Sequence, residues 1–355
     1  MYKVSVVVPI HNMEQYLRES LESVERQTIG FENIQVILVN DGSTDKSKEI
    51  MDEYASKYSN VCCLHFEEKS GAAGKPRNEG IKLVEAPYTM FLDPDDLYEE
   101  HAIERLYNTI VKENVDIVTA NYRYMEEDGR LWEKSVFDGE RFKNFAFSEE
   151  NFSDSFFVWN SACWNKIFST KLVKENNLYF LEGVPAEDAF FTYAALLASK
   201  SAYYLSETTN FYRRRSNTGT LSVSWDRSLK YFKNINFAYR KIYELFRDAD
   251  KMSLFRYFYS KTLTSVFYKV VDTTIMTEEE KKIALEEMKW FFEIRKEVDI
   301  GPCQSSLEFV FEKIENEEYD DAVKCCNIIA EMRRYIQKDV REGMSKPEFV
   351  NYVEL

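Results

Sequence analysis

The segment VSVVVPIHN (residues 4–12) is an unbroken apolar run that ends in polar residues. Such a run, rich in valine, is typical of a strand buried on both faces of a parallel sheet. Similar runs recur at residues 34–40 (IQVILVN), 61–66 (VCCLHF), 88–93 (YTMFLD) and 115–122 (VDIVTANY). The segments between them carry apolar residues at helical spacing. This alternation predicts an α/β fold in which helices flank a mostly parallel sheet.

The later part of the chain has a different pattern. From about residue 225, apolar residues recur at helical spacing, beginning with Leu229, Phe232, Ile235, Tyr239, Ile242 and Phe246. We predict further helices at residues 278–295, 305–316 and 318–338. The sequence therefore predicts an α/β domain over residues 1–224 and an α-helical domain over residues 225–355.

The composition argues against several classes of protein. The 355 residues carry a net charge of −15, whereas general nucleic-acid binders are usually basic. No apolar stretch is long enough to span a membrane, and the first apolar run fits a strand better than a secretion signal. The six cysteines show no CxxC spacing and there are three histidines, which argues against a zinc site. We expect reduced cysteines and a cytoplasmic location.

Three aspartates follow the fourth apolar run, in FLDPDDL (residues 91–97). Carboxylates this close repel one another, and burying them is unfavourable unless a cation compensates their charge. Mg²⁺ typically binds to one or two carboxylates together with substrate phosphates. A second interpretation is a capping box, formed by Asp96 and Glu99 ahead of the next helix. Because capping leaves Asp93 and Asp95 unexplained, we predict that these two residues help to bind a metal ion and a nucleotide.

Two other polar segments follow predicted strands. Asp41, in NDGSTD, could accept a hydrogen bond from the imide N–H of a base, or belong to an Asp-Gly turn. The segment SGAAGKPRN combines small residues with Lys75 and Arg77, which suits either a phosphate site or a flexible loop with solvated charges. It lacks the G-x-x-x-x-G-K-[ST] pattern, which argues against a P-loop kinase. Ligands bind beyond the carboxyl ends of the strands in such sheets, where Asp93 and Asp95 also lie.

Two later segments are strongly charged. Glu187 and Asp188, in PAEDAFF, lie at the predicted start of a helix, where the helix dipole stabilises negative charge. A carboxylate there could also act as a general base. The segment FYRRRSNTGTLS (residues 211–222) places three arginines together before a polar stretch. This cluster could close over a diphosphate, or form a solvated face.

In this order, the motifs resemble those of the inverting glycosyltransferases of family 2, which have the GT-A fold. The matching motifs are VVVPIHN, VNDGSTD, GKPRN, FLDPDD and AED, and they cover about residues 1–222. GKPRN and AED are also similar to motifs of bacterial glycosyltransferases that act on wall teichoic acid, capsule and other surface polysaccharides. The resemblance implies a GT-A catalytic domain over residues 1–224, followed by the helical domain.

The resemblance also implies a role for each matching residue. Asp188 would be the catalytic base, with Glu187 beside it. Asp95 and Asp93, the two acids of a D-x-D motif, would bind Mn²⁺ or Mg²⁺. Where this family often has a tyrosine, this chain has His11. The residues expected to bind the nucleotide sugar are Pro9, His11, Asp41, Lys75, Arg77, Asp93, Arg213 and Arg215.

The implied reaction moves a hexose or N-acetylhexosamine from a UDP-sugar to a hydroxyl of a cell-surface glycan, teichoic acid or lipid-linked acceptor. Asp188 would take the hydroxyl proton, the metal would neutralise the leaving UDP, and a single displacement would invert the anomeric centre. Two alternatives stay open, a sugar-phosphate nucleotidyltransferase and a non-catalytic nucleotide- or carbohydrate-binding module. The sequence also leaves open a homo-oligomer formed through residues 225–355 and a peripheral association with the inner face of a membrane.

Overall fold

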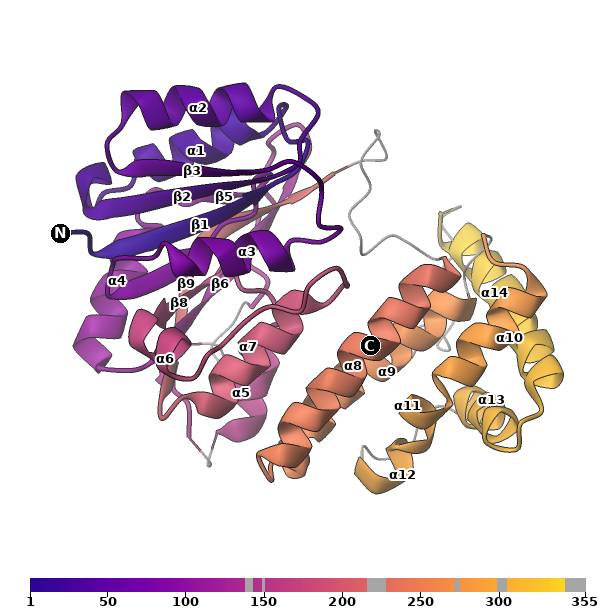
Figure 1. Cartoon of the computed structure of the whole chain (residues 1–355). Coiled ribbons are helices and arrows are strands. Elements are labelled where there is room, and N and C mark those ends of the chain that lie inside the picture. The colour runs from indigo at the N-terminus through magenta and orange to yellow at the C-terminus, as the bar shows by residue number, and fades with distance from the viewer. Residues whose placement is uncertain (138–142, 149–150, 216–227, 272–274, 299–304, 342–355) are drawn as a thin grey trace. The chain divides into compact units, whose positions relative to one another are not determined.

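The computed structural model describes residues 1–137, 143–148, 151–215, 228–271, 275–298 and 305–341. The chain divides into two compact units, Met1–Leu221 and Ser222–Leu355. The first unit mixes strands and helices, and the described part of the second is helical (Figure 1). The predicted domain boundary, between residues 224 and 225, lies outside the described residues.

The described residues of the first unit form one nine-stranded sheet. Its main order is β3-β2-β1-β4-β8-β6-β9-β5, and β7 pairs with β9. The long ladders β3–β2–β1–β4 and β6–β9 are parallel. The antiparallel ladders of β5, β7 and β8 are only two or three residue pairs long. The sheet is therefore mostly parallel, as predicted. The strands are β1 (Val4–Ile10), β2 (Ile34–Asp41), β3 (Val61–Phe66), β4 (Tyr88–Phe91), β5 (Leu97–Tyr98), β6 (Ile117–Glu126), β7 (Phe145–Ala146), β8 (Lys166–Ser169) and β9 (Ala202–Arg214).

Helices cover both faces of this sheet (Figure 1). The buried residues Val4, Val6 and Val8 of β1 belong to one core with residues of α1, α2 and α4. Because side chains alternate across a strand, Val7 points to the opposite face, where it packs against α3. The central strand thus serves two cores, which explains why its whole sequence is apolar. The helices of the unit are α1 (Leu17–Glu25), α2 (Ser47–Lys57), α3 (Gly74–Lys82), α4 (Ala102–Glu113), α5 (Phe152–Val158), α6 (Thr170–Glu175) and α7 (Glu187–Ala198), with a 3₁₀ turn at Phe31–Asn33.

Two elements of this unit differ from expectation. The interpretation of residues 70–78 as a flexible loop is wrong in its second half, because α3 begins at Gly74. The interpretation of the arginine cluster as a solvated face is wrong for Arg213, whose side chain is buried, whereas Arg214 is exposed. Both residues belong to β9, and Arg77 belongs to α3, so these three arginines lie on regular backbone.

Gly74 is placed where a larger residue does not fit. A Cβ built at this position would lie 1.9 Å from the carbonyl oxygen of Leu181. The Gly74→Ala variant is expected to lower the free energy of unfolding by about 1–3 kcal/mol, because the backbone of Leu181 must shift. Urea denaturation measures this loss, with Lys75→Ala at the exposed neighbouring position as the control. Equal stability of the two variants would contradict this account of the glycine.

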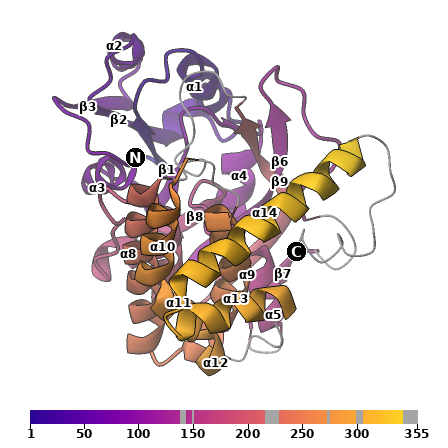
Figure 2. The same ribbon diagram turned by 90° about the vertical axis from the view of Figure 1, so that its right-hand side faces the viewer.

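The second unit is built from helices that pack around their own core. Figure 2 shows α14 lying across α9, α10 and α13, which it contacts. The predicted apolar stripe is confirmed, since Phe232, Ile235, Ile242 and Phe246 are almost fully buried on α8. The described helices are α8 (Leu229–Asp248), α9 (Met252–Val271), α10 (Glu278–Glu287), α11 (Lys289–Glu293), α12 (Arg295–Val298), α13 (Ser305–Glu315) and α14 (Tyr319–Arg341).

The prediction of one continuous helix over residues 278–295 is wrong. The chain forms three short helices there, and α10 ends at Met288, whose φ of −98° and ψ of 5° leave the helical region. Phe291 and Phe292 follow and are both fully buried.

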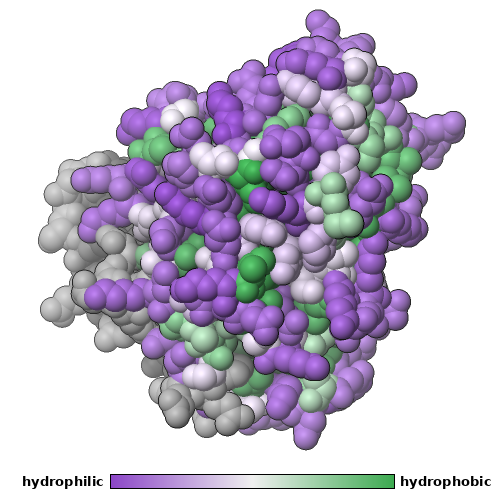
Figure 3. Space-filling model, turned by 90° about the vertical axis from the view of Figure 1, so that its left-hand side faces the viewer, coloured by the Kyte–Doolittle hydropathy of each residue, from purple (hydrophilic) through white to green (hydrophobic). Residues whose placement is uncertain are grey.

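The face shown in Figure 3 is mostly hydrophilic, with small separate apolar patches. Among the described residues, no helix combines the length and the apolar character that crossing a bilayer requires.

Candidate active site

Three of the predicted site residues lie at the edge of the sheet where β1, β2 and β4 end. β1, β2 and β4 are parallel neighbours, with Ile10 opposite Asn40 and Val7 opposite Phe91. His11, Asp41 and Asp93 lie at the carboxyl ends of these three strands. The parallel register therefore brings together groups that are far apart in the sequence.

The carboxylate of Asp41 is held by Ser70. The backbone N–H of Ser70 donates to Asp41 Oδ1 at 2.8 Å, and its hydroxyl donates to Oδ2 at 3.0 Å. His11 Nδ1 lies 2.7 Å from the Asp41 carbonyl oxygen, so Nδ1 carries the proton and Nε2 is an acceptor. Each carboxylate oxygen of Asp41 keeps a further lone pair for a base N–H. The base-binding roles of Asp41, of His11 and of Pro9, which is buried in β1, stay predictions.

Arg77 links two of the predicted acidic residues. From the first turns of α3, its Nη2 donates to Asp93 Oδ1 at 2.6 Å and its Nη1 donates to Glu187 Oε1 at 2.9 Å. Its side chain is only 4% exposed. Burial alone would lower the pKa of Arg77, but Cys163, Asp93 and Glu187 around it raise that pKa. Lys75 is exposed instead, over the ring of Phe66, so of these two residues it is Arg77 that contacts Asp93 and Glu187.

Asp188 lies in the first turn of α7, directly after Glu187. The helix starts from Ala186 in the left-handed region, with φ of 60°. The Asp188 side chain is half-buried, and its Oδ1 accepts from the N–H of Ala189 at 2.7 Å. Burial, followed by the charge of Glu187, raises the pKa of Asp188 to about 7. A carboxylate with this pKa is well matched to taking a proton near neutral pH.

Asp95 and Asp96 contact the arginine cluster. Arg215 Nε lies 2.9 Å from Asp95 Oδ2. The backbone N–H of Arg213 donates to Asp96 Oδ1 at 2.8 Å. Asp96 Oδ2 is buried and has no hydrogen-bond partner among the described residues. The capping interpretation of Asp96 is wrong, because α4 begins at Ala102, well beyond it.

Arg213 is fixed by protein partners. Its guanidinium donates to Glu19 Oε2 at 2.6 Å and to the Asp95 carbonyl oxygen at 2.9 Å. Its side chain is 3% exposed. These bonds tie α1 and the D-x-D segment to β9, so the nucleotide contact expected of Arg213 stays a prediction.

The aspartates have the chemistry of a divalent-cation site. The pKa of Asp95 is raised by burial, and that of Asp96 is raised well above its usual value by burial and by the neighbouring carboxylates. In both residues the effect of burial outweighs that of the arginines, and one oxygen of Asp96 has no hydrogen-bond partner among the described residues. Carboxylates are ligands that Mn²⁺ and Mg²⁺ prefer. The residues present therefore fit the ion, with Asp95 and Asp93 as its expected ligands.

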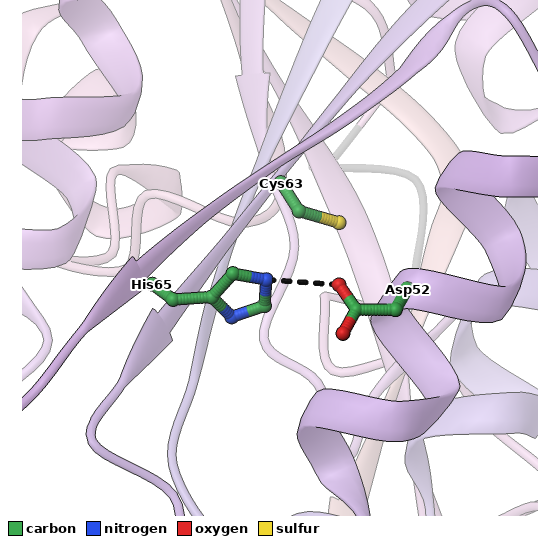
Figure 4. Close-up of side chains that lie close together, drawn as sticks. All are labelled: Asp52, Cys63 and His65. Atoms are coloured by element: carbon green, nitrogen blue, oxygen red, sulfur yellow. Dashed lines mark hydrogen bonds and ion pairs between the residues drawn. The ribbon is translucent and has the colours of Figure 1, made fainter.

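A second group of polar side chains lies on α2 and β3 and includes Asp52, Cys63 and His65, whose ligand atoms fall within 4.8 Å of one another (Figure 4). The amide of Asn40 faces His65 Nδ1 at 3.3 Å with its Nδ2, since its Oδ1 accepts from a backbone N–H. His65 Nδ1 is thus an acceptor, and Nε2–H donates to Asp52 at 3.0 Å. Burial raises the pKa of Cys63 to about 12. A protonated thiol and a protonated Nε2 disfavour metal binding by this group.

Two residues of the site were not singled out from the sequence. Ser70 orients Asp41, and Cys163 is fully buried in the surroundings of Arg77, where burial raises its pKa. Neither carries a sequence signal, because a serine in a glycine-rich stretch and an isolated cysteine are common in ordinary loops and cores.

One family model and two known glycosyltransferases are similar to this chain. The model of the family described as Glycosyl transferase family 2 matches residues 5–176. Poly(ribitol-phosphate) beta-N-acetylglucosaminyltransferase TarP of Staphylococcus aureus (strain N315) is 30% identical over 258 residues, which are 71% of this chain and 76% of TarP. Glycosyltransferase GlyA of Streptococcus pneumoniae serotype 4 is 33% identical over 233 residues, which are 63% of this chain. The match covers 32% of GlyA, so the chain spans about a third of that relative's length.

The solved structure of S. aureus TarS 1–349 in complex with UDP-GlcNAc is similar with a TM-score of 0.68 and 21% sequence identity, over 97% of this chain and 93% of that chain. This likeness shows that the chain has the GT-A fold, with a mostly parallel sheet flanked by helices and a helical C-terminal region. The family match and the extended similarity to TarP agree with that fold. The chain therefore belongs to glycosyl transferase family 2.

Proposed function

We propose that the chain transfers a hexose or N-acetylhexosamine from a UDP-sugar to a hydroxyl of a cell-surface glycan or teichoic-acid-type acceptor. The observation that carries this proposal is the half-buried Asp188 carboxylate, with a pKa of about 7, beside the Arg77-linked pair of Glu187 and Asp93. This arrangement provides a base and a charged site at the edge of the sheet where ligands bind. Membership of family 2 supports sugar transfer as the reaction.

The donor is expected to bind across the carboxyl ends of β1, β2 and β4. Asp41 would accept the uracil N–H, and His11 would lie beside the base. The positive charges of Arg77 and Arg215 would face the diphosphate. The complex of TarS with UDP-GlcNAc supports a UDP-sugar as the donor class.

The chemistry assigned to Asp188 is general-base catalysis. The acceptor oxygen forms a bond to the anomeric carbon while the bond from that carbon to the diphosphate oxygen breaks. The acceptor proton passes to Asp188, and the electron pair of the broken bond leaves with UDP. Attack from the face opposite the leaving group inverts the anomeric configuration, as in inverting glycoside chemistry.

The other acidic residues support this step. Arg77 holds Glu187 in place and acts against the burial that raises the pKa of Glu187, and Glu187 contributes to the raised pKa of Asp188. Asp95 and Asp93 would hold Mn²⁺ or Mg²⁺, which neutralises the charge that develops on the diphosphate. Cys163, which is fully buried and interacts electrostatically with Arg77, is an uncharged thiol because burial raises its pKa.

The acceptor is proposed from the relatives. TarP is named as a poly(ribitol-phosphate) transferase, which supports a polyol-phosphate or related surface polymer as the acceptor. The proposed place of reaction is the cytoplasm, at the inner face of the membrane where such a polymer is carried. The free thiols of Cys62, Cys63, Cys163, Cys325 and Cys326 agree with a reducing compartment.

A donor screen tests the proposal. The protein is incubated with UDP-glucose, UDP-galactose and their N-acetylamino forms, each with Mn²⁺, with Mg²⁺ or with EDTA, and released UDP is measured. We expect UDP release from one donor, dependent on the ion and accelerated by an acceptor polymer. Formation of pyrophosphate from UTP and a sugar phosphate would support a nucleotidyltransferase instead. Tight UDP-sugar binding without turnover on any acceptor would support a binding module.

A further inference from the structure

Asp95, the first expected metal ligand, already has a cationic partner. Arg215 Nε lies 2.9 Å from Asp95 Oδ2, and the two side chains are 16% and 14% exposed. A guanidinium at this distance neutralises the carboxylate that the divalent cation would also need. The ion and the arginine therefore compete for the same charge.

Arg215 differs from the other two arginines of the site in how firmly it is held. Arg77 bridges two carboxylates, and Arg213 donates to Glu19 and to a backbone carbonyl. Beyond Asp95, the Arg215 guanidinium approaches the sulfur of Met13 at 3.9 Å, and a thioether is a weak acceptor. Arg215 follows the last residue of β9, so its backbone lies outside the sheet. Among the described residues, moving its side chain away from Asp95 breaks, besides that ion pair, a weak contact with Met13.

We propose that Arg215 is an internal counter-cation, which neutralises Asp95 until a divalent cation replaces it and then turns its charge to the donor diphosphate. This inference rests on the proposed metal-binding role of Asp95. It predicts that the ion binds weakly to the protein alone and more tightly with nucleotide, because the diphosphate gives the displaced guanidinium a new partner. By thermodynamic linkage, the ion then strengthens nucleotide binding by the same factor.

Binding of Mn²⁺ without any sugar donor tests the inference, by electron paramagnetic resonance of the free ion. We expect Arg215→Gln to bind Mn²⁺ about tenfold more tightly than the wild type in the absence of UDP. Addition of UDP is expected to raise the Mn²⁺ affinity of both proteins, because the diphosphate also binds the ion, and to raise that of the wild type by the larger factor. Arg215→Lys, which keeps the charge, is expected to stay close to the wild type.

Arg214→Gln is the matched control, because Arg214 is the neighbouring arginine and its side chain is 49% exposed and directed to Glu126. It should leave Mn²⁺ affinity unchanged with and without UDP. Asp95→Asn distinguishes a failure of the proposed metal site from a failure of the counter-cation role of Arg215. If Asp95→Asn loses Mn²⁺ binding but Arg215→Gln gains none, the counter-cation role is wrong while the metal site stands. If Asp95→Asn binds Mn²⁺ as the wild type does, the proposed metal site is wrong and the inference falls with it.

Discussion

Asp188→Asn is expected to lower the rate of sugar transfer by about three orders of magnitude while UDP binding stays within a factor of two or three. The amide keeps the size of the side chain but cannot take the acceptor proton. Asp188 does not contribute to the Arg77 bridge between Asp93 and Glu187, so the charge network expected to face the diphosphate stays in place. Transfer is measured as kcat at saturating donor and UDP affinity by calorimetry.

Glu182→Gln is the control for this variant. Glu182 is exposed and accepts a hydrogen bond from Asn78, which its amide replacement can still do. The Glu182→Gln variant removes one carboxylate near α7 and leaves the expected base intact, so the rate of transfer should be nearly unchanged. An Asp188→Asn enzyme that keeps more than a tenth of the wild-type rate would show that another group takes the proton.

The same residue predicts the pH dependence of the reaction. Because burial and Glu187 raise the pKa of Asp188 to about 7, the carboxylate is protonated, and inactive as a base, at lower pH. We expect kcat/KM to fall about tenfold per pH unit below this value and to level off above it. The profile is measured between pH 5.5 and 8.5, and a flat profile over this range would exclude a base with this pKa.

Arg77→Met is expected to lower the free energy of unfolding by about 3 kcal/mol or more at pH 8. The variant leaves Asp93 and Glu187 without the cation that lies 2.6 Å and 2.9 Å from their oxygens. Removing one partner of a buried ion pair leaves an uncompensated charge, which costs more than the pair itself contributes. Equilibrium unfolding in urea measures the loss.

Arg18→Met provides a matched control, because Arg18 lies 2.6 Å from Glu53 but both side chains are about half exposed. Such a surface pair contributes no more than about 1 kcal/mol. The loss in Arg77→Met should also shrink at acidic pH. Burial already raises the pKa of Glu187, and Arg77 acts against that rise. Without Arg77 the pKa of Glu187 rises further, so the folded variant binds more protons than the unfolded chain and its stability decreases as pH increases. Equal losses in the two variants would show that burial does not strengthen the Arg77 bridge.

The sequence predicts the central strands of the sheet well because they are buried on both faces. The apolar runs of β1, β2 and β4 have few alternative interpretations, and the carboxyl ends of β2 and β4 identify Asp41 and Asp93 directly. The acidic start of α7 was also predicted, because two acids before a long apolar run are typical of a helix N-terminus.

β9 is not predicted, because its residues alternate in environment and the sequence does not show this alternation. Arg213 is buried whereas Arg214 is half exposed, as expected for successive residues of a strand. Three consecutive arginines contain no sign of this alternation, so the sequence alone suggests a common role for all three. The structure gives them separate partners in Glu19, Glu126 and Asp95. Each of these ion pairs joins residues that are far apart in the chain, and local sequence patterns contain no information on such pairs.

The short stretch between Phe180 and Glu187 is anchored at both ends. The amide of Asn78 exchanges hydrogen bonds with the backbone of Phe180, and Arg77 holds Glu187, so two residues of α3 secure both sides. Between these anchors, Glu182 and Gly183 are exposed. For protein engineering, this stretch is a natural graft point: new loops inserted there could change which polymers gain access to the reaction centre, while the anchors keep the aspartate that follows in register.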